Sequence, residues 1–182
     1  ANMIIPQIAR NLTRSGVRDI PSACPVCGGK TEIRQDGNAR TLYCTNPDCQ
    51  AKHVKSFALF VSRDALNIEG LSEATLEKFI GMGYIKEYAD IFHLDRYQEE
   101  ICQMEGFGEK SYQNLMDSIE KARTTTLARV IYGIGIPGIG LANAKMICRE
   151  FHNDVETLLQ AKEEDLSAIS GVGEVLAGAF TG

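Results

Sequence analysis

The stretch Ile134–Ile147, which reads IGIPGIGLANAKMI, decides the fold of this chain. At its centre Gly138 and Gly140 flank a single apolar residue, and further apolar residues follow at helical spacing. Glycine adopts positive φ easily and lets another molecule approach the bare backbone. The pattern predicts two helices joined by a tight hairpin. The second helix would begin with unpaired N–H groups, which suit an anion.

This pattern occurs four times. Its first glycine stands at positions 70, 106, 138 and 171, with spacings of 36, 32 and 33 residues, as is typical of a repeat array. Two residues ahead of each first glycine is an apolar residue that should face a core: Ile68, Met104, Ile136 and Ile169. We therefore predict four helix-hairpin-helix motifs near residues 65–80, 101–120, 133–150 and 166–182.

Hairpins of this kind offer backbone amides, which bind phosphates by position and without reading the base sequence. For any single motif the alternative is a purely structural hairpin whose glycines only close the turn, because short glycine patterns are weakly specific. Four motifs in a row favour nucleic acid.

Four cysteines ahead of the repeats form a second motif with the spacing C-x2-C-x16-C-x4-C: Cys24, Cys27, Cys44 and Cys49. Two cysteine knuckles joined by a β-hairpin (strands near 30–34 and 40–43) are typical of a closed, structural tetrathiolate zinc site. The alternative of two disulfides is disfavoured in an intracellular chain. His53 could compete as a ligand, but four cysteines already complete the zinc shell.

The charge is divided unevenly along the chain, whose net charge is −5. Residues 1–55 carry 8 lysines and arginines against 4 acidic residues, whereas residues 56–182 carry 11 against 20. The front of the chain is basic (+4) and the repeat region acidic (−9), so the hairpins can hold phosphates only if the acidic side chains lie on other faces. No secretory signal or membrane span is visible, and we expect a cytoplasmic protein with no membrane partner.

No catalytic constellation is visible, so the set of catalytic residues is predicted to be empty. Arg34–Gly37 is similar to the K-x-D-G motif of nucleotidyltransferases. However, arginine stays protonated and cannot replace the nucleophilic lysine of that motif.

Taken together, the motifs resemble the C-terminal part of the bacterial NAD+-dependent DNA ligases, namely the end of the OB-fold, the zinc finger and the helix-hairpin-helix domain. The residues that carry this resemblance, in order along the chain, are Ile4–Pro6, Cys24–Gly28, Ser62–Leu71, Glu105–Ser111 and Gly135–Gly140.

The resemblance implies a parent enzyme that seals nicks in duplex DNA during replication and repair, using NAD+ and Mg²⁺. None of the adenylation machinery is here, so we expect this chain alone to be inactive and to bind nicked duplex DNA for the missing adenylation and OB-fold domains. It implies a mostly α fold with three regions: 1–22, the tail of an OB-fold and a connector; 23–55, a small four-cysteine zinc-finger β-hairpin; and 56–182, an all-α array of four helix-hairpin-helix motifs.

Ser72 replaces the second glycine of the first hairpin, so we expect that motif to be mainly structural. The residues expected to contact DNA are Gly106, Gly108, Lys110, Gly138, Gly140, Lys145, Gly171 and Gly173. Two rivals remain: a zinc and hairpin scaffold for a basic protein partner, and the hairpin region of another DNA repair enzyme.

Overall fold

A computed structural model of the protein describes residues 10, 12, 16 and 20–181. Most of the region 1–22, predicted to be the tail of an OB-fold and a connector, lies outside the described residues. The chain divides into two compact units, Ala1–Cys49 and Gln50–Gly182. The predicted zinc-finger region, 23–55, takes in most of the first unit and the first six residues of the second.

The first unit is built on one antiparallel hairpin, β1 (Thr31–Asp36) and β2 (Ala39–Cys44), in the register Thr31 to Cys44. Gly37 adopts a φ of +55° in the turn between the strands. Most side chains of both strands are exposed, including the cross-strand pair Ile33 and Leu42. Since an isolated two-stranded hairpin is marginal in water, this unit needs another source of stability.

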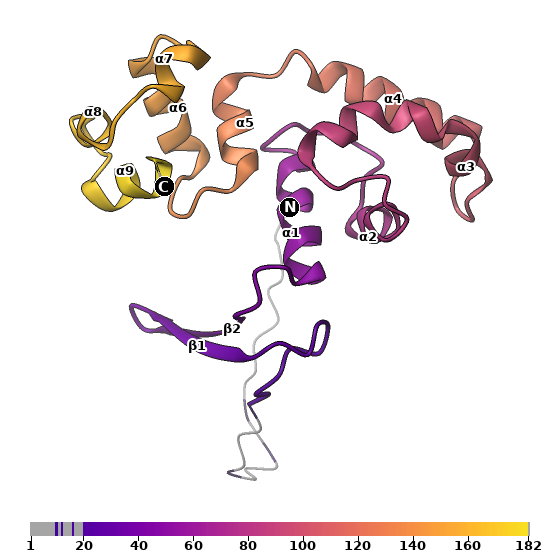
Figure 1. Cartoon of the computed structure of the whole chain (residues 1–182), viewed down its shortest axis with the longest axis horizontal. Coiled ribbons are helices and arrows are strands. Elements are labelled where there is room, and N and C mark those ends of the chain that lie inside the picture. Colours follow the sequence, from indigo (N-terminus) through magenta and orange to yellow (C-terminus); the bar gives the residue numbers. More distant parts are fainter. Residues whose placement is uncertain (1–9, 11, 13–15, 17–19, 182) are drawn as a thin grey trace. The chain divides into compact units, whose positions relative to one another are not determined.

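The second unit is helical (Figure 1). Its elements are α1 (Gln50–Val61), α2 (Glu73–Gly81), the 3₁₀ helix η1 (Tyr88–Tyr97), α3 (Gln98–Gln103), α4 (Glu109–Ala122), α5 (Leu127–Ile134), α6 (Leu141–Glu150), α7 (Val155–Leu159), α8 (Glu163–Ser167) and α9 (Glu174–Thr181). The predicted fold class, mostly α with a small β-hairpin at the cysteines, is confirmed.

Two hydrophobic cores organise these helices. The first joins the helices from α1 to α4 around Leu76, Phe79 and Leu115, which are fully buried. The second joins α5 to α9 around Ala144, Ile147 and Leu166. Each core therefore contains two of the four predicted hairpins.

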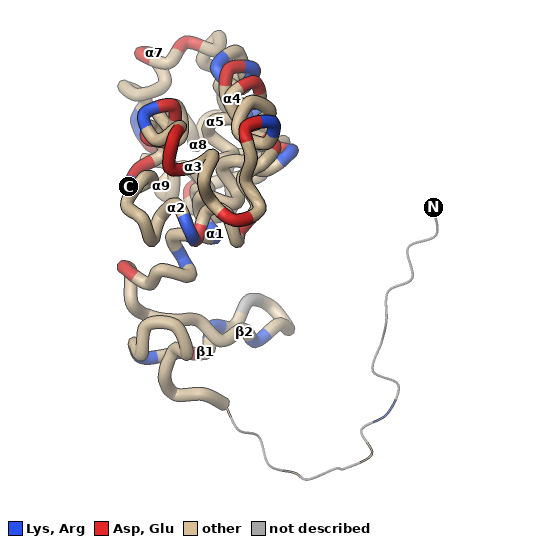
Figure 2. The backbone as a smooth tube through the Cα atoms, turned by 90° about the vertical axis from the view of Figure 1, so that its right-hand side faces the viewer, with Lys and Arg blue, Asp and Glu red and all other residues tan. Residues whose placement is uncertain are grey.

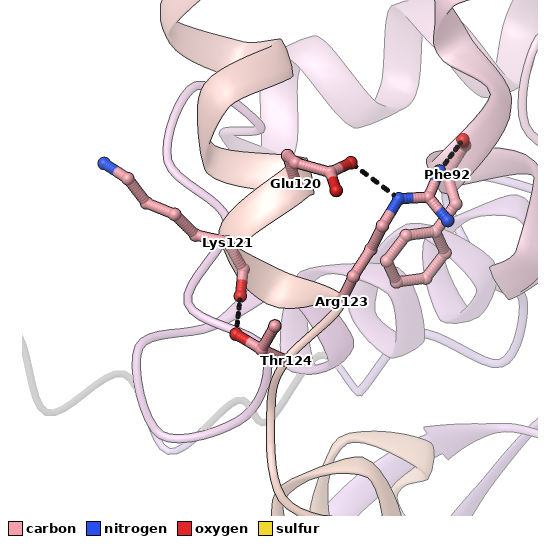
Figure 3. A network of polar contacts seen from close by, with 5 residues as sticks. All are labelled: Phe92, Glu120, Lys121, Arg123 and Thr124. Atoms are coloured by element: carbon pink, nitrogen blue, oxygen red, sulfur yellow. Dashed lines mark hydrogen bonds and ion pairs between the residues drawn. The ribbon is translucent and has the colours of Figure 1, made fainter.

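The end of α4 is tied to η1 by Arg123 (Figure 3). Its guanidinium donates to the Phe92 carbonyl at 2.9 Å, pairs with Glu120 at 2.9 Å and lies 5.3 Å from the centre of the Phe92 ring. The next residue, Thr124, donates its hydroxyl to the carbonyl of Lys121 at 2.9 Å. These contacts terminate α4 and lead the chain from the first core to the second.

Candidate metal centre and nucleic-acid interface

The four predicted cysteines converge in the structure. All four Sγ atoms lie within 4.8 Å of one another, with 3.9 Å between Cys24 and Cys49 and 3.5 Å between Cys27 and Cys44. A tetrahedral zinc with bonds of about 2.3 Å would place its sulfurs ~3.8 Å apart, so the cluster has the size of a zinc tetrathiolate. None of the four is in a disulfide, and His53 is not among the converging groups in the described chain.

Tight turns place these thiols. Gly28 has a φ of +69° and donates its amide to the carbonyl of Cys24 at 2.9 Å, while the Gly29 amide points at Cys27 Sγ at 3.4 Å. Amide donors of this kind orient metal-bound thiolates and stabilise their charge.

The pKa values of Cys27 and Cys44 shift in opposite directions. Hydrogen bonds from the Gly29 amide and then the Asn46 side chain lower the pKa of Cys27 to about 6. Removal from water raises the pKa of Cys44 to about 11. Four adjacent thiols cannot all ionise unaided, whereas a divalent cation would deprotonate all of them. The residues present therefore fit zinc.

The four hairpins repeat the same backbone geometry. The first glycine of each has positive φ: +93° at Gly70, +82° at Gly106, +79° at Gly138 and +93° at Gly171. In the last three hairpins the following amide donates to the carbonyl three residues earlier, at 2.9 Å for Phe107, 3.0 Å for Ile139 and 2.9 Å for Val172. The first glycine is therefore required by the turn itself.

The helix that follows each hairpin also starts at the same point. Residue 72, 108, 140 or 173, the second position of each glycine pair, accepts the first hydrogen bond of the helix. The donor is the amide four residues later, as in Ala144, which donates to the Gly140 carbonyl at 2.9 Å. The four residues that donate these amides are all buried: Leu76, Tyr112, Ala144 and Ala177. Amides of the first turn generally lack carbonyl partners at a helix start; in the fourth hairpin the Leu176 amide donates to the Gly173 carbonyl at 2.9 Å.

The second glycines have no comparable structural role. A Cβ atom added at Gly108, Gly140 or Gly173 would meet nothing within 4 Å. Gly108 and Gly140 have φ values of −124° and −79°, which any residue adopts, and no side chain caps the helices that they begin. Packing within the chain therefore does not require glycine at these three positions.

The first hairpin differs at the same position. Ser72 accepts the amide of Thr75 at 3.2 Å, and Glu73 forms an exposed ion pair with Lys55 at 2.7 Å. The start of α2 is thus partly satisfied by the chain itself.

All eight residues predicted to contact DNA are exposed and lie on hairpins two to four. Among the described residues neither Lys110 nor Lys145 is in an ion pair. Red and blue segments are interspersed along the tube of the helical unit, so its acidic excess is spread over several elements (Figure 2).

Two comparisons with known families bear on these sites. The model described as the NAD-dependent DNA ligase C4 zinc finger domain matches residues 23–51 and so includes the four cysteines. The model described as the helix-hairpin-helix motif matches residues 129–181, which hold the third and fourth hairpins.

Individual relatives match almost the whole chain. It is 61% identical over 180 residues to a protein named DNA ligase from Lachnoclostridium phytofermentans, covering 99% of this chain and 28% of the relative. Over nearly its whole length the chain is similar to one part of a protein named DNA ligase. A second ligase-named relative, from Ruminiclostridium cellulolyticum, is 56% identical over 99% of this chain and 27% of its own length. The resemblance inferred from the motifs is confirmed, and the chain spans a little over a quarter of the length of these relatives.

One structural residue of this chain was missed by the sequence reasoning. Arg129 donates to two backbone carbonyls of the turn after α1, Ala65 and Arg63. Its only signal in the sequence is that it is the single charged residue of α5.

None of the helices in the described part of the chain has the length and apolar character needed to cross a bilayer.

Proposed function

We propose that this chain is the part of an NAD+-dependent DNA ligase that grips nicked duplex DNA without sequence specificity. The observation that carries the proposal is the set of second glycines, Gly108, Gly140 and Gly173. Neither packing nor backbone conformation requires glycine at these positions. The absence of a side chain there would instead allow another molecule to approach the helix amides closely. Phosphates fit such a site because the amides and the helix dipole both favour an anion.

The proposed contacts are the backbones of hairpins two to four, supported by Lys110 and Lys145. Hairpin one is assigned a structural role, because Ser72 occupies one amide of its helix start. Cys24, Cys27, Cys44 and Cys49 are proposed to hold one structural zinc. We assign residues 23–55 to the zinc finger and 56–182 to the hairpin region.

The whole ligase would supply the chemistry: transfer of AMP from NAD+ to the 5′-phosphate with Mg²⁺, and nick sealing. We assign no catalytic residue to this chain, whose partners would be the DNA and the adenylation and OB-fold domains of the same protein. A cytoplasmic location belongs to the same proposal, because reducing conditions keep the four thiols available for zinc.

The test is a titration of the zinc-loaded chain with nicked duplexes of two unrelated sequences at rising salt. We expect similar affinities for both sequences and a linear loss of log affinity with log salt, with a slope of ~0.9 per phosphate contacted. Lys110→Gln and Lys145→Gln should each lower that slope, whereas Lys52→Gln is a matched control on α1. A flat salt response, or no binding at low salt, would refute the proposal.

The rival reading is a scaffold for a basic protein partner, which the acidic excess of residues 56–182 would suit. Its discriminating result would be a protein complex that weakens when acidic residues are neutralised, in a chain that does not bind DNA.

A further inference from the structure

The two cores of the helical unit meet through α1 and α5, which pack against each other between the remaining helices (Figure 1). α1 belongs to the core that carries hairpins one and two, and α5 belongs to the core that carries hairpins three and four. The α1–α5 contact therefore determines how the two hairpin pairs are spaced.

Glycine makes this contact close. Gly133 is buried, and a Cβ atom there would lie 3.1 Å from Ala65 Cβ, 3.2 Å from Phe60 Cδ2 and 3.4 Å from Leu66 Cδ1. Two residues later a Cβ atom on Gly135 would lie 2.9 Å from Leu59 Cδ2. Little room remains for a larger side chain between the two helices.

Arg129 fixes the same contact by hydrogen bonds. It lies one helical turn before Gly133, is half-buried, and donates from Nε to the Ala65 carbonyl at 2.6 Å and from its terminal nitrogen to the Arg63 carbonyl. Both acceptors belong to the turn that follows α1. Because the guanidinium is planar and its donors are fixed relative to one another, two such bonds set the orientation of α5 as well as its distance.

We propose that Arg129, together with Gly133, is a positioning residue that holds the two hairpin pairs at the spacing needed to grip one duplex at the same time. The proposal rests on the DNA-gripping function proposed above. Phosphate-binding groups on rigid elements are productive only when the elements are correctly placed. Loosening the joint should therefore prevent the two hairpin pairs from binding the duplex together, although each pair stays intact.

The test compares Arg129→Met with Arg149→Met in the zinc-loaded chain. Met keeps an unbranched apolar side chain but cannot donate, and Arg149 is an exposed arginine on α6 at the end away from its hairpin. Salt titrations with nicked duplex are made well below each variant's melting temperature. We expect Arg129→Met to lower the salt slope by ~0.9 for every phosphate that is no longer bound, towards that of a Gly140→Val/Gly173→Val chain, and Arg149→Met to keep most of the slope.

A residue with a purely structural role would lower the melting temperature but leave the slope of the folded chain unchanged, and that result would overturn the proposal. Should Arg129→Met not fold, Gly133→Ala tests the same joint, because its Cβ would push α5 away from Ala65 and Phe60. A folded Gly133→Ala chain with the wild-type slope would then overturn it. If the wild-type chain itself shows no salt-dependent binding, the proposed function fails. If the wild-type chain binds with the expected salt slope and Arg129→Met has the same slope, only the positioning role of Arg129 is refuted.

Discussion

Gly138 and Gly140 stand two residues apart in the third hairpin, and their substitution should separate folding from DNA binding. Gly140 has a φ of −79° and a ψ of 171°, and an added Cβ would meet no atom within 4 Å. Gly140→Val should therefore lower the free energy of unfolding only by the loss of a favourable N-cap residue, about 0.5–1 kcal/mol. For a chain of this size, that corresponds to a fall in melting temperature of about 1–4 °C.

The same substitution should weaken DNA binding much more. The valine side chain would occupy the open space through which a phosphate must approach the amides of the first turn of α6. A hydrogen bond to a charged group contributes about 1.5–3 kcal/mol, so losing one lowers affinity about 10- to 100-fold. The salt slope should also fall by ~0.9 for each phosphate released.

Gly138→Ala provides the matched comparison. Gly138 has a φ of +79°, and its Cβ would lie 2.6 Å from Leu176 Cδ2. Left-handed backbone at a residue other than glycine costs about 1–3 kcal/mol, and the clash with Leu176 adds to this cost. Thermal unfolding should therefore show the larger loss for Gly138→Ala, and titration of the folded proteins the larger loss for Gly140→Val. If Gly140→Val were the less stable of the two, or bound DNA like the wild type, the assignment of the second glycine to phosphate binding would be wrong.

Three further outcomes are expected. Metal analysis should find about one zinc per chain, and chelation should unfold the β-hairpin unit, which has little apolar core of its own, while helical circular dichroism from the second unit persists. Hydrogen bonds from the Thr157 hydroxyl and then its amide hold the pKa of Asp154 below its usual range. The stabilising effect of the Asp154 carboxylate is therefore complete above its unfolded pKa of about 3.9 and is lost as the pH falls through the folded value. The urea midpoints of wild type and Asp154→Asn should converge at low pH, and a constant difference would contradict this prediction. Ser118 accepts the amide of Glu69 at 2.8 Å, so Ser118→Ala should lower the free energy of unfolding by about 1–3 kcal/mol in urea without changing the DNA salt slope.

The parts of this fold that could be predicted from sequence are those whose residue type is determined locally. Gly106, Gly138 and Gly171 are required by positive φ in a turn, and the cysteine knuckles are required by short loops around one point. Both therefore leave a fixed spacing in the sequence. The hairpin positions and the convergence of the thiols follow from these spacings.

Features that depend on contacts distant in sequence were not predictable. Arg129 meets carbonyls more than sixty residues away, and nothing near it in sequence indicates those acceptors. The short helices α7 and α8 could not be located from sequence, because five residues give too little periodicity to mark a helix.

The third and fourth hairpins each support the turn of the other. Leu176 of α9 lies under Gly138, and Met146 of α6 lies under Gly171, where an added Cβ would be 3.3 Å from its terminal methyl. Removing one motif from the second core would remove the side chain that packs against the turn of the other motif, and would expose apolar surface. During evolution such motifs should therefore be gained or lost as pairs, and a shortened chain that keeps both motifs of a core should keep that core folded, whereas a chain that keeps only one of them should not.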